Sequence, residues 1–422
     1  MTSRSAEAGG SRPLPRAAGW DASLAFRADP YRYIARQCAA LGSDVFETRL
    51  LLVPTLCMSG ARAAELFYDE ARFCRAGAAP RALQATLFGC GGVQGLDDAA
   101  HRHRKALFLR ITAAERAERL LHGVRREWEA ALHDWTQAGS LSLFDAVQPV
   151  LTRAVCDWAG VPVPEPQLRQ RSDQLAALFD GAAGSPARHL GARWSRKRAE
   201  AWLAGLIEAA RSRRTRLPNG SAAQVIAEHR EPNGELLPAR IAAVELLNVL
   251  RPTVAVSVYI AFVAHALQAH PQWKPVLAED AESADALAFV QEVRRHYPFF
   301  PAVAARVRED FEWQGHAFVR GRRALFDLYG SNHDARLWNE PDRFAPQRWQ
   351  QRRPTPWDLV PQGGADAARQ HRCPGEDIAL RLMLLAAQML TRRLRYEAHA
   401  QSAQIDMRRL PALPWRGFLM ER

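Results

Sequence analysis

The sequence predicts a mainly α-helical fold with a small β portion. Most of the 422-residue chain carries apolar residues at three-to-four spacing, the period that lines one face of a helix. Alternating or β-rich segments are few and short. A hydrophobic content of 48% and a charged content of 24% are typical of a folded soluble protein, and the length permits a large core.

The expected helices are spread over the whole chain. Helical spacing of apolar residues occurs in segments 30–42, 61–68, 98–109, 113–138, 143–159, 166–180, 192–216, 221–229, 237–269, 283–297 and 375–393. The longest apolar run, within 241–267, is broken by Glu245, Arg251, Pro252 and other polar residues. Such interruptions predict a buried helix of a soluble protein and no membrane span.

The expected strands occupy segments 45–57, 306–313 with 317–319, 324–329 and a weak C-terminal group near Tyr396 and Phe418. Residues 1–17 are rich in Ser, Gly, Pro, Ala and Arg and lack an apolar core, so we expect a disordered tail and no signal peptide. Residues 18–422 are expected to form a single domain. The Pro-, Gln- and Arg-rich segment 330–372 is longer than an ordinary connection, which favours a functional loop.

Charge and cysteine usage exclude several classes of function. The net charge is +12, but acidic residues are interspersed with the arginines and no long basic block occurs, so nucleic acid and anionic lipid are not expected partners. The six cysteines are far apart and form no CxxC pair, which indicates neither a zinc site nor a disulfide framework. A reducing cytoplasm is the expected location.

One cysteine has the surroundings of a metal ligand. Cys373 precedes Pro374, Gly375 and Glu376 at the start of an apolar helical pattern. A thiolate there is stabilised by the N–H groups and the positive end of the helix, and Gly375 removes a Cβ where a flat macrocycle would press on the backbone. The alternative is that Cys373 is a small buried residue in front of a well-capped helix.

Two charged motifs precede Cys373 in a distinctive order. Glu292 and Arg295 stand three apart on one expected helix, and Arg343 follows in the run 339–344, Asn-Glu-Pro-Asp-Arg-Phe. The order of Glu-x-x-Arg, Pro-Asp-Arg-Phe and Cys-Pro-Gly resembles the cytochrome P-450 superfamily of haem-thiolate oxygenases. This resemblance implies the cytochrome P-450 haem-thiolate fold, haem b with its iron bound by Cys373, and a buried charge triad of Glu292, Arg295 and Arg343 that holds the Cys loop.

The resemblance also implies residues for the haem propionates. His101 and Lys105 are four apart on one expected helical face, where the family places donor groups for the propionates, and Arg75 and His371 are further candidates. The alternative for His101 is an exposed histidine on a charged helix. A metal site of the HxH type lacks a third nearby ligand.

Arg251 and Pro252 break the rules of the helix that contains them. Proline has no N–H for the carbonyl of Asn248, and a buried guanidinium needs an anion. This pair and the segment 73–108 both resemble the fatty-acid peroxygenase branch of the cytochrome P-450 superfamily. The resemblance implies that Arg251 binds the carboxylate of a long-chain fatty acid, that this carboxylate replaces a missing acid of the protein, and that hydrogen peroxide is the oxidant.

By the same resemblance, hydroxylation occurs at the α or β carbon and no dedicated redox partner is needed. An open alternative is that Arg251 pairs with a propionate or with a carboxylate from another helix. Gln94 stands at a loop position where alkene-forming members of the branch carry histidine, so it favours hydroxylation with minor decarboxylation to terminal alkene. Phe88, and Phe299 or Phe300, are expected walls of the substrate pocket.

Two other functions remain open from the sequence. The first is a reductase-dependent haem monooxygenase of another carboxylic acid, in which Thr253 supplies an alcohol group. The second is a non-catalytic haem-thiolate protein that binds lipid or acts as a sensor. Only for a peroxygenase do we expect the loss of Arg251 to abolish both fatty-acid binding and turnover with peroxide.

Overall fold

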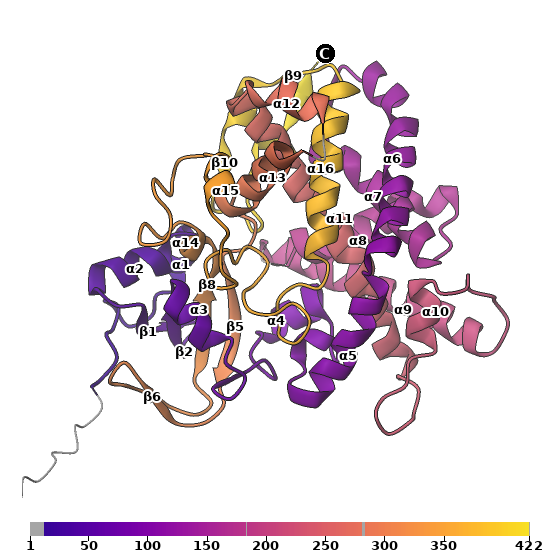
Figure 1. The fold of residues 1–422 in the computed structure, drawn as a ribbon. Coiled ribbons are helices and arrows are strands. Elements are labelled where there is room, and N and C mark those ends of the chain that lie inside the picture. The colour runs from indigo at the N-terminus through magenta and orange to yellow at the C-terminus, as the bar shows by residue number, and fades with distance from the viewer. Residues whose placement is uncertain (1–11, 183, 281–282, 422) are drawn as a thin grey trace, which may run out of the picture.

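The computed structural model describes residues 12–182, 184–280 and 283–421, and its helices are shown in Figure 1. The α-helices are α1 Ser23–Ala28, α2 Tyr33–Leu41, α3 Ala61–Phe67, α4 Arg81–Leu83, α5 Asp98–Ile111, α6 Ala114–Gln137, α7 Leu143–Ala159, α8 Leu168–Asp180, α9 Pro186–Arg211, α10 Ala222–Ala227, α11 Ala239–Ala269, α12 Trp273–Glu279, α13 Ala284–His296, α14 Leu328–Asn332, α15 Arg348–Gln351 and α16 Glu376–Arg392. A short π-helix, η1, spans Gln84–Phe88, and 3-10 turns occupy Val93–Gly95, Glu165–Gln167, Ala400–Ala403 and Trp415–Gly417. The prediction of a mainly helical fold is confirmed.

The strands form one five-stranded sheet and three small sheets. They are β1 Val45–Leu50, β2 Val53–Met58, β3 Phe73–Cys74, β4 Ser140–Ser142, β5 Ala302–Val307, β6 Phe311–Trp313, β7 His316–Phe318, β8 Arg323–Asp327, β9 Glu397–Ala398, β10 Ile405–Asp406, β11 Leu413–Pro414 and β12 Leu419–Glu421. The large sheet has the order β1-β2-β8-β5-β3, with β2 and β8 parallel and the other pairs antiparallel. Figure 1 shows this sheet beside the larger helical part.

Local residues explain where several elements differ from the prediction. The expected strand 45–57 is a hairpin, because Leu51 and Leu52 adopt positive φ values of 53° and 62° and reverse the chain. The expected strand 324–329 ends at Asp327, whose carboxylate accepts a hydrogen bond from the Gly330 N–H at 2.7 Å and so starts α14. Helix α9 begins earlier than expected, at Pro186, because the Ser185 hydroxyl caps it.

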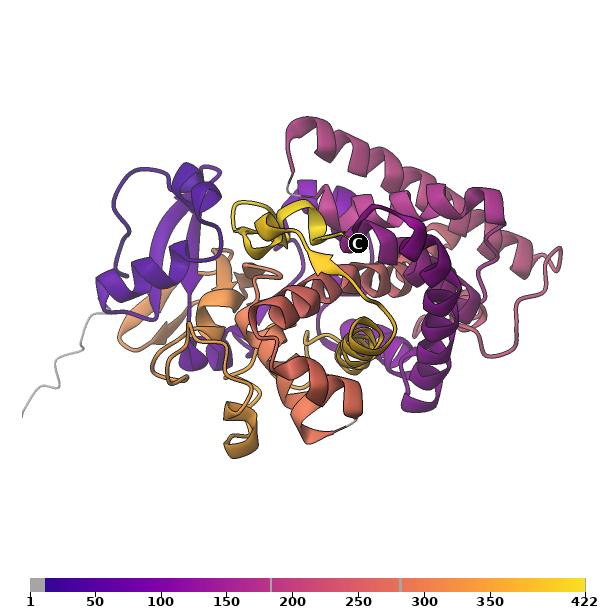
Figure 2. The ribbon, with the colours of Figure 1, turned by 90° about the horizontal axis from the view of Figure 1, so that it is seen from above.

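Helix α11 is the central helix of the fold. It packs against α7, α8, α9 and α16, and its side chains are buried along almost the whole length. Seen from above, α16 stands end-on within the helical part (Figure 2). By length and composition α11 could cross a membrane, but 94% of its most apolar window is buried inside the fold, as in a core helix.

The N-terminal segment differs from the predicted tail. Residues 1–11 lie outside the described residues, but 12–17 follow the sheet: the Arg12 N–H donates to the Gly315 carbonyl at 2.7 Å and Ala17 is buried. The Glu47 N–H also donates to the Pro15 carbonyl at 2.8 Å. The predicted disorder is therefore wrong for 12–17, because the β6–β7 hairpin and the free edge of β1 supply partners that composition does not reveal.

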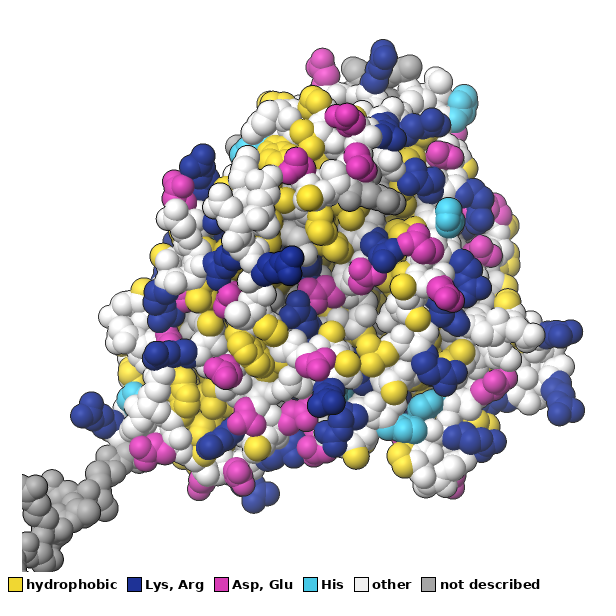
Figure 3. Space-filling model, in the orientation of Figure 1, with side chains coloured by type: hydrophobic (Ala, Val, Ile, Leu, Met, Phe, Trp, Pro, Cys, Tyr) yellow, Lys and Arg dark blue, Asp and Glu magenta, His cyan; other side chains and the backbone are white. Residues whose placement is uncertain are grey.

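Charges are mixed over the surface. On the face shown in Figure 3, Lys and Arg side chains alternate with Asp and Glu, and no patch of one sign spans the face. This distribution agrees with the interspersed charges of the sequence.

Candidate active site

Cys373 lies in a loop whose backbone is held in place. The Cys373 N–H donates to the Gln362 carbonyl at 3.1 Å, and α16 begins at Glu376 with Gly375 as its N-cap. Burial raises the pKa of the Cys373 thiol, while a hydrogen bond from the Gly375 N–H to the sulfur lowers it. The sulfur thus has an N–H donor from the helix start, which favours a thiolate bound to a metal.

Arginines lock the first turn of α16 to this loop. Arg372 donates to the Glu376 carboxylate at 2.6 and 2.9 Å, and Arg294 of α13 also pairs with Glu376. Burial alone would raise the pKa of Glu376, but the two arginines lower it to about 2. This cluster was absent from the sequence prediction, although Arg294 lies inside the Glu-x-x-Arg motif.

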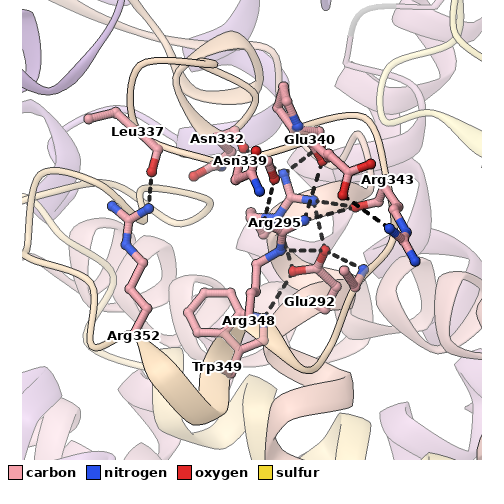
Figure 4. Close-up of polar contacts among 12 residues, drawn as sticks. Glu292, Arg295, Asn332, Leu337, Asn339, Glu340, Arg343, Arg348, Trp349 and Arg352 are labelled. Carbon is pink, nitrogen blue, oxygen red and sulfur yellow. Dashed lines mark hydrogen bonds and ion pairs between the residues drawn. The ribbon is translucent and has the colours of Figure 1, made fainter.

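The predicted charge triad forms, with one member different (Figure 4). Glu292 and Arg295 are fully buried, and Arg295 donates to both carboxylate oxygens at 3.0 and 2.8 Å. The third member is Arg348, whose Nε donates to Glu292 at 3.1 Å. The Trp349 indole N–H and the Ala345 N–H complete the shell, both at 2.9 Å.

The prediction of Arg343 in the triad is wrong. Its side chain is 68% exposed and pairs with Glu340 at 3.0 Å, and only its backbone carbonyl accepts from Arg295 at 3.2 Å. The chain turns between Arg343 and α15, so the first residue of α15 points to Glu292 while Arg343 points to solvent. The Arg348-Trp349 pair, which follows Pro346 and Gln347, is the sequence signal that could have found the correct member.

The four residues predicted for the propionates lie together. The rings of His101 and His371 stack at 3.8 Å, and Arg75 stacks on the Phe67 ring at 4.1 Å. Burial, followed by Lys105, lowers the pKa of His101 to about 4, and burial, followed by Arg75, His101 and Lys105, depresses the pKa of His371. His101 Nδ1 is buried without a hydrogen-bond partner among the described residues. Crowded cationic and donor groups with an orphaned nitrogen fit an anionic group such as the propionates of haem.

Lys105 has a second task in this cluster. Its ammonium group donates to the carbonyls of Gln370 and Arg372 at 2.6 and 2.5 Å, on either side of His371. Burial lowers the pKa of Lys105 to about 8. Lys105 therefore ties α5 to the loop that carries Cys373, in addition to the role that the resemblance implied.

Arg251 is a buried arginine without an anion. It is 7% exposed, its Nε has no hydrogen-bond partner, and no ion pair joins it to any residue in the described part of the chain. Burial and then Arg196 lower the pKa of Arg251, while Cys373 raises it, so the guanidinium and the sulfur face a common region. A buried guanidinium in this state is a strong site for a carboxylate.

The acidic residue of the same helix that could have paired with Arg251 already has other partners. Glu245 is fully buried and pairs with Arg104 of α5 at 2.6 Å. Its other oxygen accepts from the Asn248 amide at 2.9 Å, and the same amide donates to Gln94 Oε1 at 3.1 Å. Gln94 is thus oriented by a buried network that reaches Arg104, which the sequence did not reveal because its members are far apart in the chain.

Pro252 and Thr253 follow Arg251 within the unbroken helix α11. The Thr253 hydroxyl donates to the Val249 carbonyl at 3.0 Å, one turn earlier. Local backbone bonding therefore occupies the hydroxyl that a reductase-dependent mechanism would require.

The predicted phenylalanines have different surroundings. Phe88 ends the π-helix η1 and is partly buried against the main core. Phe299 stacks on Tyr259 of α11 at 4.4 Å and contacts Phe300 at 4.5 Å. Their roles as pocket walls stay predictions.

Comparison with known proteins identifies the family. The family model "Cytochrome P450" matches residues 286–419, which contain the triad and Cys373. A cytochrome P450 of Mycobacterium tuberculosis (strain ATCC 25618 / H37Rv) is 31% identical over 139 residues, which is 31% of each protein. Cytochrome P450 81F2 of Arabidopsis thaliana is 28% identical over 32% of this chain and 26% of that protein. These curated relatives are thus matched over about a third of their length or less.

Solved structures match over nearly the whole chain. Cytochrome P450SP alpha (CYP152B1) in complex with (R)-ibuprophen has a TM-score of 0.93 and 49% identity, covering 96% of this chain and 98% of that one. Cytochrome P450EX alpha (CYP152N1) with myristic acid has a TM-score of 0.91 and 39% identity, covering 97% and 99%. A variant of cytochrome P450 OleT in complex with arachidonic acid has a TM-score of 0.92 and 29% identity, covering 97% and 98%. The chain therefore belongs to the cytochrome P450 family, within the fatty-acid peroxygenase branch to which its sequence is similar.

Proposed function

We propose that this protein hydroxylates long-chain fatty acids at the α or β carbon with hydrogen peroxide, with minor decarboxylation to terminal alkene. The observation that carries the proposal is Arg251, a buried guanidinium for which the described residues offer no anion. The ligands named for the three solved structures are all carboxylic acids, which supports a carboxylate as the partner of Arg251. We further propose a cytoplasmic enzyme without a dedicated redox partner.

The family cofactor is haem b, which when bound supplies the iron that activates peroxide. We propose that Cys373 provides the thiolate ligand, with Lys105 and Arg372 holding its loop. His101, His371 and Arg75 offer donors and positive charge for the propionates. The Glu292, Arg295 and Arg348 network fixes the chain that leads into the Cys loop.

On the substrate side, Arg251 binds the carboxylate with two parallel N–H bonds in a site from which water is excluded. This contact would hold the carboxylate end of the chain in one place, so that oxidation falls on the first carbons next to it. Arg251 would hold a carboxylate oxygen where it could accept one proton of hydrogen peroxide and give it to the oxygen that leaves as water when the O–O bond breaks. Gln94 does not titrate near neutral pH, so it orients groups without supplying a proton.

Arg251→Ala tests the proposal. We expect the haem-loaded wild-type protein to convert myristic acid to 2-hydroxy or 3-hydroxy acid with hydrogen peroxide alone, detected by gas chromatography and mass spectrometry. The variant should lose fatty-acid binding and at least about 100-fold in kcat/KM, because both positioning and the carboxylate are lost.

Arg198→Ala is the matched control, because Arg198 is exposed on α9 and should leave turnover unchanged. Turnover that requires NAD(P)H and a reductase would support a monooxygenase of another acid instead. Fatty-acid binding without any product would support a lipid-binding or sensor protein.

A further inference from the structure

Arg196 of α9 is a further buried arginine, and it lies outside the charge triad and the Cys373 loop. It is 2% exposed, and its guanidinium donates to three successive carbonyls at the end of η1: Thr86 at 3.4 Å, Leu87 at 3.3 Å and Phe88 at 3.2 Å. Its Nε donates to Glu200 at 2.6 Å. The last carbonyls of a helix lack intrahelical donors and carry the negative end of its dipole, so a guanidinium there is a strong cap.

Gly89, which follows η1, provides the space that the Arg196 guanidinium occupies. Gly89 has φ +81°, and a Cβ added there would lie 2.0 Å from the Arg196 Nη2 and 2.8 Å from the Val244 Cγ1. A side chain at this position would therefore push the guanidinium away from the carbonyls. Because Val244 belongs to α11, the end of η1 is pressed between α9 and α11.

The capped segment packs against the helix that carries the proposed carboxylate anchor. Val244, which faces Gly89 at the end of η1, precedes Arg251 on α11 by about 10 Å along the helix. Arg196 is also, after burial, the main cause that lowers the pKa of Arg251. Phe88 is the last residue of η1, directly beside the carbonyls that Arg196 binds. The carboxylate end of a substrate is thus set by Arg251, while the backbone that carries Phe88 is set by Arg196.

We propose that Arg196 is a positioning residue that fixes Phe88 against the first carbons of the fatty acid and so determines the ratio of α to β hydroxylation. The inference rests on the proposed function. Each nitrogen of Arg196 donates to the protein, to Glu200 or to the three carbonyls, so we assign it a structural contact and not a catalytic one. Its effect on the reaction is transmitted through the backbone of η1.

The test compares four haem-loaded proteins with myristic acid and hydrogen peroxide. Arg196→Gln removes the charge and most of the cap; Gly89→Ala keeps Arg196 but displaces it, and so covers the case in which Arg196→Gln does not fold. Arg198→Gln, on the exposed side of the same helix, is the control. Two quantities are measured: the ratio of 2-hydroxy to 3-hydroxy acid, and amide hydrogen exchange of the peptide spanning 84–92.

We expect Arg196→Gln and Gly89→Ala to speed exchange in 84–92 and to change the product ratio by about threefold or more, while the control does neither. Unchanged exchange, or faster exchange with an unchanged ratio, would overturn the positioning role. A wild-type protein that forms no hydroxy acid would instead overturn the proposed function, and the inference with it.

Discussion

Buried arginines in this protein fall into two kinds, and the difference lies in their partners. Arg295 is fully buried but donates to Glu292 and to the carbonyls of Asn332 and Pro341 at 2.9 and 2.8 Å, so its charge is compensated within the fold. Arg251 is nearly as buried and has no such partner among the described residues. The first stabilises the structure, and the second is available for an external anion.

Arg348→Ala is expected to destabilise the protein, since it removes a donor from the buried Glu292. The free energy of unfolding should fall by about 2 to 4 kcal/mol, because a buried ion network is broken. Arg343→Ala should change it by less than about 0.5 kcal/mol, since its pair with Glu340 is exposed to solvent. Urea unfolding of both variants measures the difference, and equal losses would contradict the assignment of Arg348.

At the scale of elements, α11 combines structural and functional tasks along one helix. Its apolar side chains fill the core, while Glu245, Asn248 and Arg251 present polar groups within about two turns. Pro252 has no N–H for the Asn248 carbonyl, yet the helix continues because packing on all sides holds it. The polar residues and the proline of this apolar helix therefore lie together, at the candidate active site.

Thr253→Ala tests whether α11 supplies an alcohol group to the reaction. We expect peroxide-driven turnover to stay within about threefold of wild type, far from the roughly 100-fold loss that removal of a general acid causes. The reason is that the Thr253 hydroxyl already donates to the Val249 carbonyl. Steady-state rates with myristic acid measure this, and a large loss would favour the reductase-dependent alternative.

At the scale of the whole molecule, the Cys loop lies where the sheet region meets the helical part. The Val360 N–H donates to Asn332 Oδ1 at 2.9 Å, and the Gln370 amide donates to the Tyr68 carbonyl at 2.7 Å. On the other side, Lys105 of α5 holds the carbonyls of Gln370 and Arg372. The position of Cys373 thus depends on both parts of the fold.

Asp327 gives the molecule a pH-dependent stability. It is buried between β8 and α14, accepts from the Gly330 N–H and the Ser59 hydroxyl, and also faces the Ala35 N–H and Asp334. Burial raises its pKa from 3.8 to about 7, so the folded protein keeps a proton that the unfolded chain releases. Stability from this group is therefore complete below about pH 4 and declines as the pH rises towards about 7.

Asp327→Asn is expected to remove this decline, because the amide stays neutral: its oxygen can accept from the Gly330 N–H and its NH2 can donate to the Ser59 hydroxyl. The variant should gain stability relative to wild type as the pH increases from about 5 to about 8. Unfolding midpoints across this range measure the effect, with the exposed Asp342→Asn as control. Parallel pH profiles for wild type and Asp327→Asn would contradict it.

The sequence by itself predicted the helical class and most helix positions, and it marked Cys373 and Arg251 as unusual for their surroundings. These features are local: a helical period is visible within one segment, and a proline or an unpaired arginine inside an apolar helix conflicts with its immediate neighbours. They can therefore be recognised without knowing the rest of the fold.

Only the tertiary structure decided which partners distant polar groups find. Whether Arg343 or Arg348 reaches Glu292 depends on one turn of a long loop, and the contacts of Arg104 with Glu245 and of Arg196 with η1 join segments more than a hundred residues apart. The order of residues 12–17 likewise depends on the β6–β7 hairpin and on the free edge of β1. Such contacts follow from packing and from the need to pair buried polar groups, which local sequence patterns do not specify.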